Sequence, residues 1–185
     1  IPGAFGSSLR DQRTGRELWP GTSTMLLVSS YLGLELDIDA ATLEPMAGDT
    51  AAHDVFEEGL GQDFYGRVLR TLERAGGYSR CGPCQKPRPD RRNFYVYPYD
   101  FRFDNVRAVQ GLHQLIEQIR ADYGDPRLSV DVLAHSNGGL LARYYARYGT
   151  EPLPESGPFR PTGAGAADIR RLLLVGTPNL GTIQP

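Results

Sequence analysis

The sequence predicts an α/β protein with a mostly parallel sheet that is covered by helices on both faces. In the second half of the chain, short apolar runs alternate with amphipathic helical patterns. One apolar run leads straight into a serine, two glycines and a further helical pattern. Strands that alternate with helices favour parallel pairing, because the crossover helices cover the sheet. The 185 residues are enough for one domain with a real core, so we expect a single domain over residues 1–185. About residues 9–92 are expected to include a variable, cap-like region.

The first third of the chain has weak patterns. Residues 1–3 read as the end of a strand, and residues 3–8 as a loop of small side chains. The charged segment 10–16 is predicted to be exposed. An apolar cluster within residues 25–32 predicts a short helix, and residues 34–62 are expected to form a variable connection.

The pattern becomes sharper from residue 63 onward. Apolar side chains at positions 64, 68, 69 and 72 share one helical face, and Gly76 or Gly77 is predicted to end that helix. Residues 81–92 read as a basic loop with several prolines. Residues 93–97 then read as a strand.

The second half carries the strongest periodicity. Apolar positions 106, 109, 112, 115, 116 and 119 follow helical spacing, with Asp104 or Asn105 as the expected cap. A strand is predicted at 128–133 and a helix at 140–148, which Gly149 stops. The proline- and glycine-rich segment 152–165 is predicted to be a loop, and 171–175 a strand.

Composition limits the classes of partner. The chain is 40% hydrophobic and 23% charged, as in globular proteins, and its net charge of −2 gives no reason to expect nucleic acid. No apolar stretch approaches the length of a membrane span. The first residues do not look like a signal peptide, although a removed signal would leave no trace, so the compartment stays open with a preference for the cytoplasm. The sequence says nothing of the oligomeric state.

The two cysteines form a Cys81-Gly82-Pro83-Cys84 motif. The spacing matches a thioredoxin-type redox motif, but such a motif follows a buried strand and opens a helix. Here glycines precede the motif and prolines follow it, which favours free thiols or a local disulfide in a loop. Two cysteines alone cannot complete a four-ligand zinc site, and we expect neither a metal nor a cofactor.

Ser136 is the candidate nucleophile. The pattern Ala134-x-Ser136-x-Gly138 is typical of a nucleophile elbow, a sharp strand-to-helix turn with small residues on both sides of the serine. A serine that attacks an ester also needs donors for the resulting oxyanion. The backbone N–H of Asn137 is the first predicted donor, and the N–H of Ala4, in the early glycine-containing loop, is the second.

No histidine is well placed to activate this serine. His135 is adjacent to Ser136, and neighbouring side chains on such a turn diverge. His113 lies on the amphipathic helix, and His53 lies in the weakly patterned region. We expect His53 and His113 to be surface or packing residues.

Five motifs in one order resemble a known family. They are Ile1-Pro2-Gly3-Ala4-Phe5-Gly6-Ser7, Gly77-Tyr78, Tyr99-Asp100-Phe101-Arg102, Ala134-His135-Ser136-Asn137-Gly138-Gly139 and Gly176-Thr177-Pro178-Asn179-Leu180-Gly181-Thr182. Together they resemble the lecithin:cholesterol acyltransferase-like branch of the α/β-hydrolases. The resemblance implies an α/β-hydrolase fold, a nucleophile at Ser136 and oxyanion donors at Ala4 and Asn137. The family often has tryptophan where Phe101 stands and methionine where Asn137 stands, and neither change removes a backbone donor.

One departure concerns the catalytic triad, which in α/β-hydrolases runs serine, acid, histidine along the chain. No histidine follows Ser136, and the only later aspartate, Asp168, precedes a predicted strand and reads as a loop or cap residue. Glu151 and Glu155 lie in or beside the proline-rich loop and are poor candidates for the acid. We therefore expect a hydrolase whose sheet is truncated after the strand that follows the elbow.

The resemblance implies a serine esterase, lipase or acyltransferase that acts on lipid or other small acyl esters through an acyl-enzyme. Contact with lipid surfaces is a further expectation. An alternative is a non-catalytic binding module without a complete triad, and a third is a thiol redox protein that uses Cys81 and Cys84.

Overall fold

The computed structural model describes residues 1–22, 33–46, 48–59, 61–154 and 156–181. The predicted helix within residues 25–32 lies in residues 23–32, outside the described part. The elements in chain order are β1 (Ser7–Asp11), β2 (Glu17–Trp19), β3 (Thr50–Val55), β4 (Glu58–Gly59), β5 (Gln62–Asp63), α2 (Gly66–Arg74), β6 (Tyr78–Arg80), β7 (Arg92–Phe94), α3 (Asn105–Tyr123), β8 (Val130–His135), α4 (Asn137–Tyr148), the 3₁₀ turn η1 (Ala166–Asp168) and β9 (Ile169–Val175). None of the described helices is long and apolar enough to cross a bilayer.

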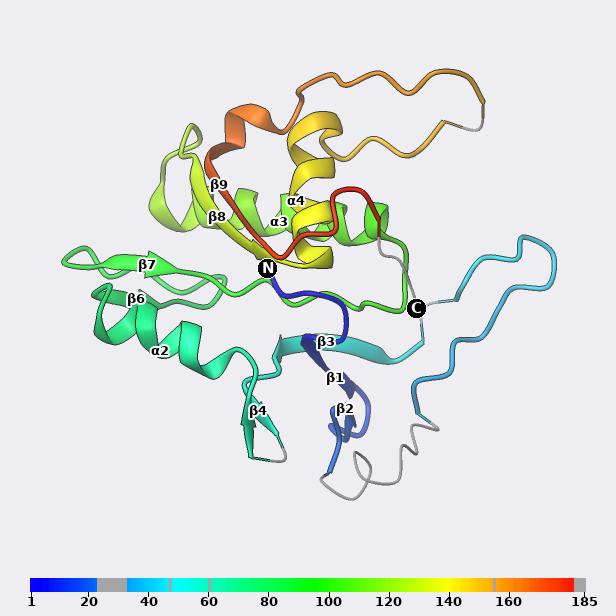
Figure 1. Cartoon of the computed structure of the whole chain (residues 1–185), viewed down its shortest axis with the longest axis horizontal. Helices are drawn as coiled ribbons and strands as arrows, with labels where there is room; N and C mark the ends of the chain where they lie inside the picture. The colour runs from blue at the N-terminus through cyan, green and yellow to red at the C-terminus, as the bar shows by residue number, and fades with distance from the viewer. Residues whose placement is uncertain (23–32, 47, 60, 155, 182–185) are drawn as a thin grey trace.

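The elements form two tiers with the strand pair β6–β7 between them (Figure 1). The lower tier holds the antiparallel sheet β2-β1-β3, in which Ser7 pairs with Val55 and Leu9 with Ala52. Leu9 is fully buried in this sheet. The sequence patterns missed all three strands, because none of them alternates clearly between apolar and polar side chains. The pairing of β1 with β3 also joins segments about forty residues apart.

The upper tier holds α3, α4 and the parallel pair β8–β9 (Figure 1). Asp104 caps α3 as predicted, since its side chain accepts the Arg107 N–H at 3.0 Å. The cluster of buried side chains between the helices consists of Tyr99, Ala108, Val109, Leu112, Ile116, Leu141 and Tyr145. This core fixes α4 against α3 and so positions the turn where α4 begins.

The predicted α/β-hydrolase fold, with a mostly parallel sheet and helices on both faces, is wrong for this structure. In the described ranges the strands fall into four small sheets: the antiparallel β2-β1-β3, the antiparallel pair β4–β5, and the parallel pairs β6–β7 and β8–β9. Parallel pairing is thus confined to two pairs. Alternation of strands with helices shows that parallel pairing is possible, but it does not say which strands become neighbours.

The last strand differs from the expectation of a strand buried in a sheet. Leu173 and Val175 on β9 are each 50% exposed. The register aligns Leu133 with Leu173 and His135 with Val175, so these side chains share the face of the pair opposite to buried Val132 and Ala134. The helices therefore cover only one face of the β8–β9 pair.

Helix α2 also buries less than its pattern predicts. Leu69 is buried, but Phe64 and Val68 are 51% and 37% exposed. Phe64 precedes the helix and stacks on Phe56, with ring centroids 4.4 Å apart. The apolar face of α2 is therefore only partly covered.

Candidate active site

The turn between β8 and α4 holds Ser136 in an unusual backbone conformation. Strand β8 ends at His135, helix α4 begins at Asn137, and Ser136 between them has φ +52° and ψ −124°. A residue with a side chain in this region costs about 1–3 kcal/mol and is found where a site requires it. The strand–serine–helix arrangement that the sequence pattern predicted is therefore present.

Two glycines let the new helix approach its neighbours. A Cβ atom on Gly138 would lie closer than 3.0 Å to the carbonyl oxygens of Pro2 and Ile1. A Cβ atom on Gly139 would collide with the side chain of Thr177. The sequence analysis expected small residues here, and the structure identifies what they make room for.

The N-terminal segment lies directly beside the serine. The backbone nitrogen of Ile1 donates to the Leu133 carbonyl at 2.8 Å, and His135 N–H donates to the Ile1 carbonyl at 3.0 Å. A Cβ atom on Gly3 would lie 2.8 Å from Ser136 Cβ and 3.3 Å from Ser136 Oγ. Residues 1–3 thus run along β8 and bring the early loop to the serine.

Both predicted oxyanion donors border this point. Ala4 follows Gly3, and Asn137 is the first residue of α4, where helix N–H groups lack partners within the helix. In the described part of the chain, neither N–H group is engaged in a hydrogen bond. The Asn137 side chain is fixed by Tyr99 Oη at 2.9 Å and by the Asn105 carboxamide at 3.0 Å.

Tyr65, which the sequence analysis missed, joins the two sides of the site. Gly3 N–H donates to Tyr65 Oη at 2.8 Å, and Tyr65 Oη lies 2.8 Å from His135 Nδ1. The hydroxyl donates to Nδ1 or accepts from it according to the tautomer of His135, and burial raises the pKa of Tyr65, so that the hydroxyl keeps its proton. No sequence signal marks Tyr65, because the contact depends on the position of α2 relative to β8.

Replacing Tyr65 with phenylalanine is expected to loosen this link without removing the ring. Gly3 N–H and His135 Nδ1 would lose their shared partner, at a cost in unfolding free energy of about 1 kcal/mol. If Tyr65 also positions the early loop, Ser136 should react more slowly with a serine-directed fluorophosphonate even under conditions in which the variant is fully folded. Chemical denaturation measures the stability of the variant, and labelling kinetics measure the reactivity of Ser136. A change in stability alone would assign Tyr65 a purely structural role.

The other predicted candidates lie elsewhere. His53 pairs with Glu17 at 3.0 Å, and His113 Nδ1 lies 2.9 Å from Tyr145 Oη. Asp168 sits in the 3₁₀ turn before β9, bound to Arg120. Among the described residues, the Ser136 hydroxyl has no hydrogen-bond partner.

Of the two glutamates after α4, the structure describes only Glu151, whose backbone carbonyl accepts the Tyr144 hydroxyl at 2.6 Å; Glu155 lies outside the described residues. The structure therefore places Ser136 beside the two predicted donors, and among the described residues it brings no acid–base pair to them.

The two cysteines are free thiols, Cys81 buried and Cys84 exposed. The short strand β6 precedes Cys81 but holds no buried residue, and the described residues between β6 and β7 form no helix. Across the described ranges, no group of three or more His, Cys, Asp or Glu side chains is arranged to hold a metal ion.

Comparison of the chain with known protein families, with curated proteins and with solved structures gave no match.

Proposed function

We propose that the chain is a serine-dependent hydrolase or acyltransferase that acts on lipid or other carboxylic esters through an acyl-enzyme on Ser136. The observation that carries this proposal is the backbone conformation of Ser136 at the strand-to-helix turn, φ +52° and ψ −124°. A nucleophile elbow places its serine in a strained conformation of this kind, at a sharp turn from a strand into a helix.

The surroundings of the serine support the same chemistry. Attack of Ser136 Oγ on an ester carbonyl transfers negative charge to the carbonyl oxygen, and the N–H groups of Asn137 and Ala4 are free to receive it. The N-terminal end of α4 adds the positive end of a helix dipole. Collapse of the intermediate expels the alcohol and leaves the acyl group on Ser136, from which water or a second alcohol removes it.

The order of the five sequence motifs adds to this proposal, because the lecithin:cholesterol acyltransferase-like family combines such motifs with ester substrates.

The hydroxyl proton of Ser136 must pass to a base, and no described side chain is placed to take it. Catalysis at the full rate therefore requires a base beyond those that the structure brings to Ser136.

A serine-directed fluorophosphonate tests the proposal on the chain itself. We expect slow but selective phosphonylation of Ser136, located by peptide mass spectrometry, because an oxyanion hole without a working triad still gives about 10³- to 10⁴-fold acceleration over water. Ser136→Ala should abolish the label. Ser129→Ala, which removes a partly buried serine just before the same strand, should leave it unchanged.

A non-catalytic binding module is the second candidate, and the absence of a described base beside Ser136 favours it. The same experiment separates the two. If Ser136 remains unlabelled while the folded chain retains its stability, the enzyme proposal fails and the binding module is preferred.

A further inference from the structure

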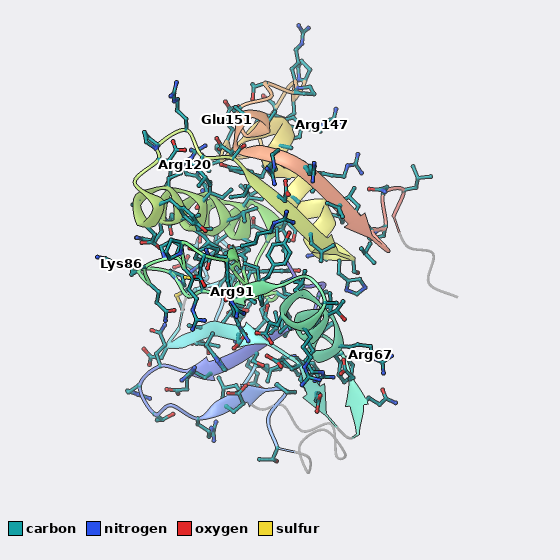
Figure 2. The ribbon with its side chains drawn as sticks, turned by 90° about the vertical axis from the view of Figure 1, so that its left-hand side faces the viewer. Arg67, Lys86, Arg91, Arg120, Arg147 and Glu151 are labelled. Atoms are coloured by element: carbon teal, nitrogen blue, oxygen red, sulfur yellow. The ribbon has the colours of Figure 1, made fainter. Side chains whose placement is uncertain are left out.

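An open hollow of about 290 Å³ lies between α2 and the loop that joins β6 to β7. It is lined by Glu73, Tyr78, Ser79, Arg80, Arg88 and Arg91. Figure 2 shows Arg91 and Lys86 at the level between α3 and the three-stranded sheet, whereas Arg147 lies toward the top of the view, beyond α3. The hollow shares no lining residue with the turn at Ser136 and is a separate feature.

The hollow carries positive charge that the chain does not neutralise. Within the described ranges, neither Arg88 nor Arg91 takes part in an ion pair. The guanidinium of Arg80, in contrast, forms ion pairs with the carboxylates of Asp54 and Glu57. Glu73 is the one carboxylate that lines the hollow. Two unpaired guanidinium groups against one carboxylate leave the site cationic in a chain of net charge −2.

A single side chain holds the backbone of both arginines. Asn93 Oδ1 accepts the Arg88 N–H at 3.2 Å, and Asn93 Nδ2 donates to the carbonyls of Arg88 and Arg91 at 3.1 and 3.3 Å. The same Nδ2 lies 2.7 Å from Tyr123 Oη on α3. Prolines on both sides of Arg88 restrict the loop further. The backbone positions of the two arginines are therefore fixed relative to each other before any ligand arrives.

We propose that this hollow binds a phosphate group, with Arg88 and Arg91 as its cationic ligands. Guanidinium groups match phosphate oxygens with paired, charge-assisted hydrogen bonds, and a loop backbone that is already ordered leaves only the two side chains to be ordered on binding. Glu73 opposes a bare anion and sets the affinity below what the arginines alone would give. The phosphate belongs either to a small soluble phosphate ester or to the headgroup of a phospholipid.

Two binding experiments on the whole chain separate these sources. Calorimetric titration with glycerol 3-phosphate tests the soluble ester. Co-sedimentation with phosphatidylcholine vesicles, with and without phosphatidylglycerol, tests the lipid headgroup. We expect binding in at least one arm. Arg88→Ala and Arg91→Ala should each weaken it by at least about tenfold, because each removes a charge-assisted contact.

Two further variants keep the result interpretable. Glu73→Gln should strengthen binding, a gain that damaged folding cannot produce. Arg147→Ala removes an exposed arginine outside the hollow and should leave binding unchanged. Binding to vesicles alone assigns the headgroup, and binding to glycerol 3-phosphate assigns the soluble ester. Absence of binding in both arms would overturn the proposal, as would equal losses in Arg147→Ala and the two hollow variants.

Discussion

Replacing Gly138 with alanine is expected to cost about 3 kcal/mol or more of unfolding free energy and to abolish reaction at Ser136. The added Cβ atom would lie closer than 3.0 Å to the carbonyl oxygens of Pro2 and Ile1. Backbone oxygens cannot rotate away as a side chain can, so α4 or the N-terminal segment must move. Either movement separates Ser136 and Asn137 from Gly3 and from the proposed oxyanion donor at Ala4. Urea denaturation and fluorophosphonate labelling measure the two losses.

Two other glycines provide the comparison. At Gly139 the added Cβ atom would overlap with Thr177 Oγ1 and lie 2.9 Å from Thr177 Cβ. Rotation about χ1 moves Oγ1 but not Cβ, so we expect Gly139→Ala to destabilise the chain as well, but by less than Gly138→Ala, whose closest contact is with a backbone oxygen. At Gly48 an added Cβ atom would meet nothing within 4 Å, so Gly48→Ala should be neutral or slightly stabilising. A Gly138→Ala variant that is as stable and as reactive as Gly48→Ala would contradict the close approach on which the site depends.

The elements with strong local patterns were predictable from the sequence. Helix α3 combines regular apolar spacing with an aspartate cap, and both are properties of neighbouring residues. The turn at Ser136 was predictable for the same reason, because the strand, the serine and the glycines are contiguous. The predicted bounds differ by two or three residues at β8 and α4, where periodicity is a weaker guide than backbone hydrogen bonding.

Long-range pairing was not predictable. Strand β1 pairs with β3 across a gap of about forty residues, and the segment 7–11 was read as part of a loop and a charged stretch. The parallel fold class failed for a related reason, since strand neighbours are chosen by tertiary packing. Tyr65 illustrates the same limit within the site: its hydroxyl links Gly3 to His135 although the three are distant in sequence.

Substitution of Asp168 is also expected to lower stability strongly, because Asp168 is the centre of a largely buried polar network. Its carboxylate accepts from Arg120 Nη2 at 2.7 Å and from the hydroxyl of Tyr145, which is 1% exposed and also contacts His113. The side chains of Asp168 and Arg120 are each 14% exposed. This network ties α3, α4 and the turn before β9 together at the end of α4 remote from Ser136.

Asp168→Asn is expected to lower the unfolding free energy by about 2–4 kcal/mol at neutral pH. The change removes the more buried of the two carboxylates that pair with Arg120, leaving only the half-exposed Glu117, and it weakens the charge-assisted hydrogen bonds from Tyr145 and Arg120. Urea denaturation at pH 7 measures the loss. Asp131→Asn is the matched control, because Asp131 pairs with Arg170 at 2.6 Å on the surface, where such pairs contribute about 1 kcal/mol or less.

The acid dependence of this difference tests the charge of Asp168. Burial raises the pKa of its carboxyl, but the hydrogen bonds from Tyr145 and Arg120 and the charge of Arg120 outweigh burial, so the net pKa lies below the ordinary value of 3.8. A lowered pKa in the folded state stabilises the protein above the unfolded pKa, and this stabilisation disappears as the pH falls through the folded value. The gap between the native chain and Asp168→Asn should therefore be largest above about pH 5 and should shrink below about pH 4. A gap that is the same at pH 7 and pH 3 would show that the carboxylate charge is not what stabilises the network.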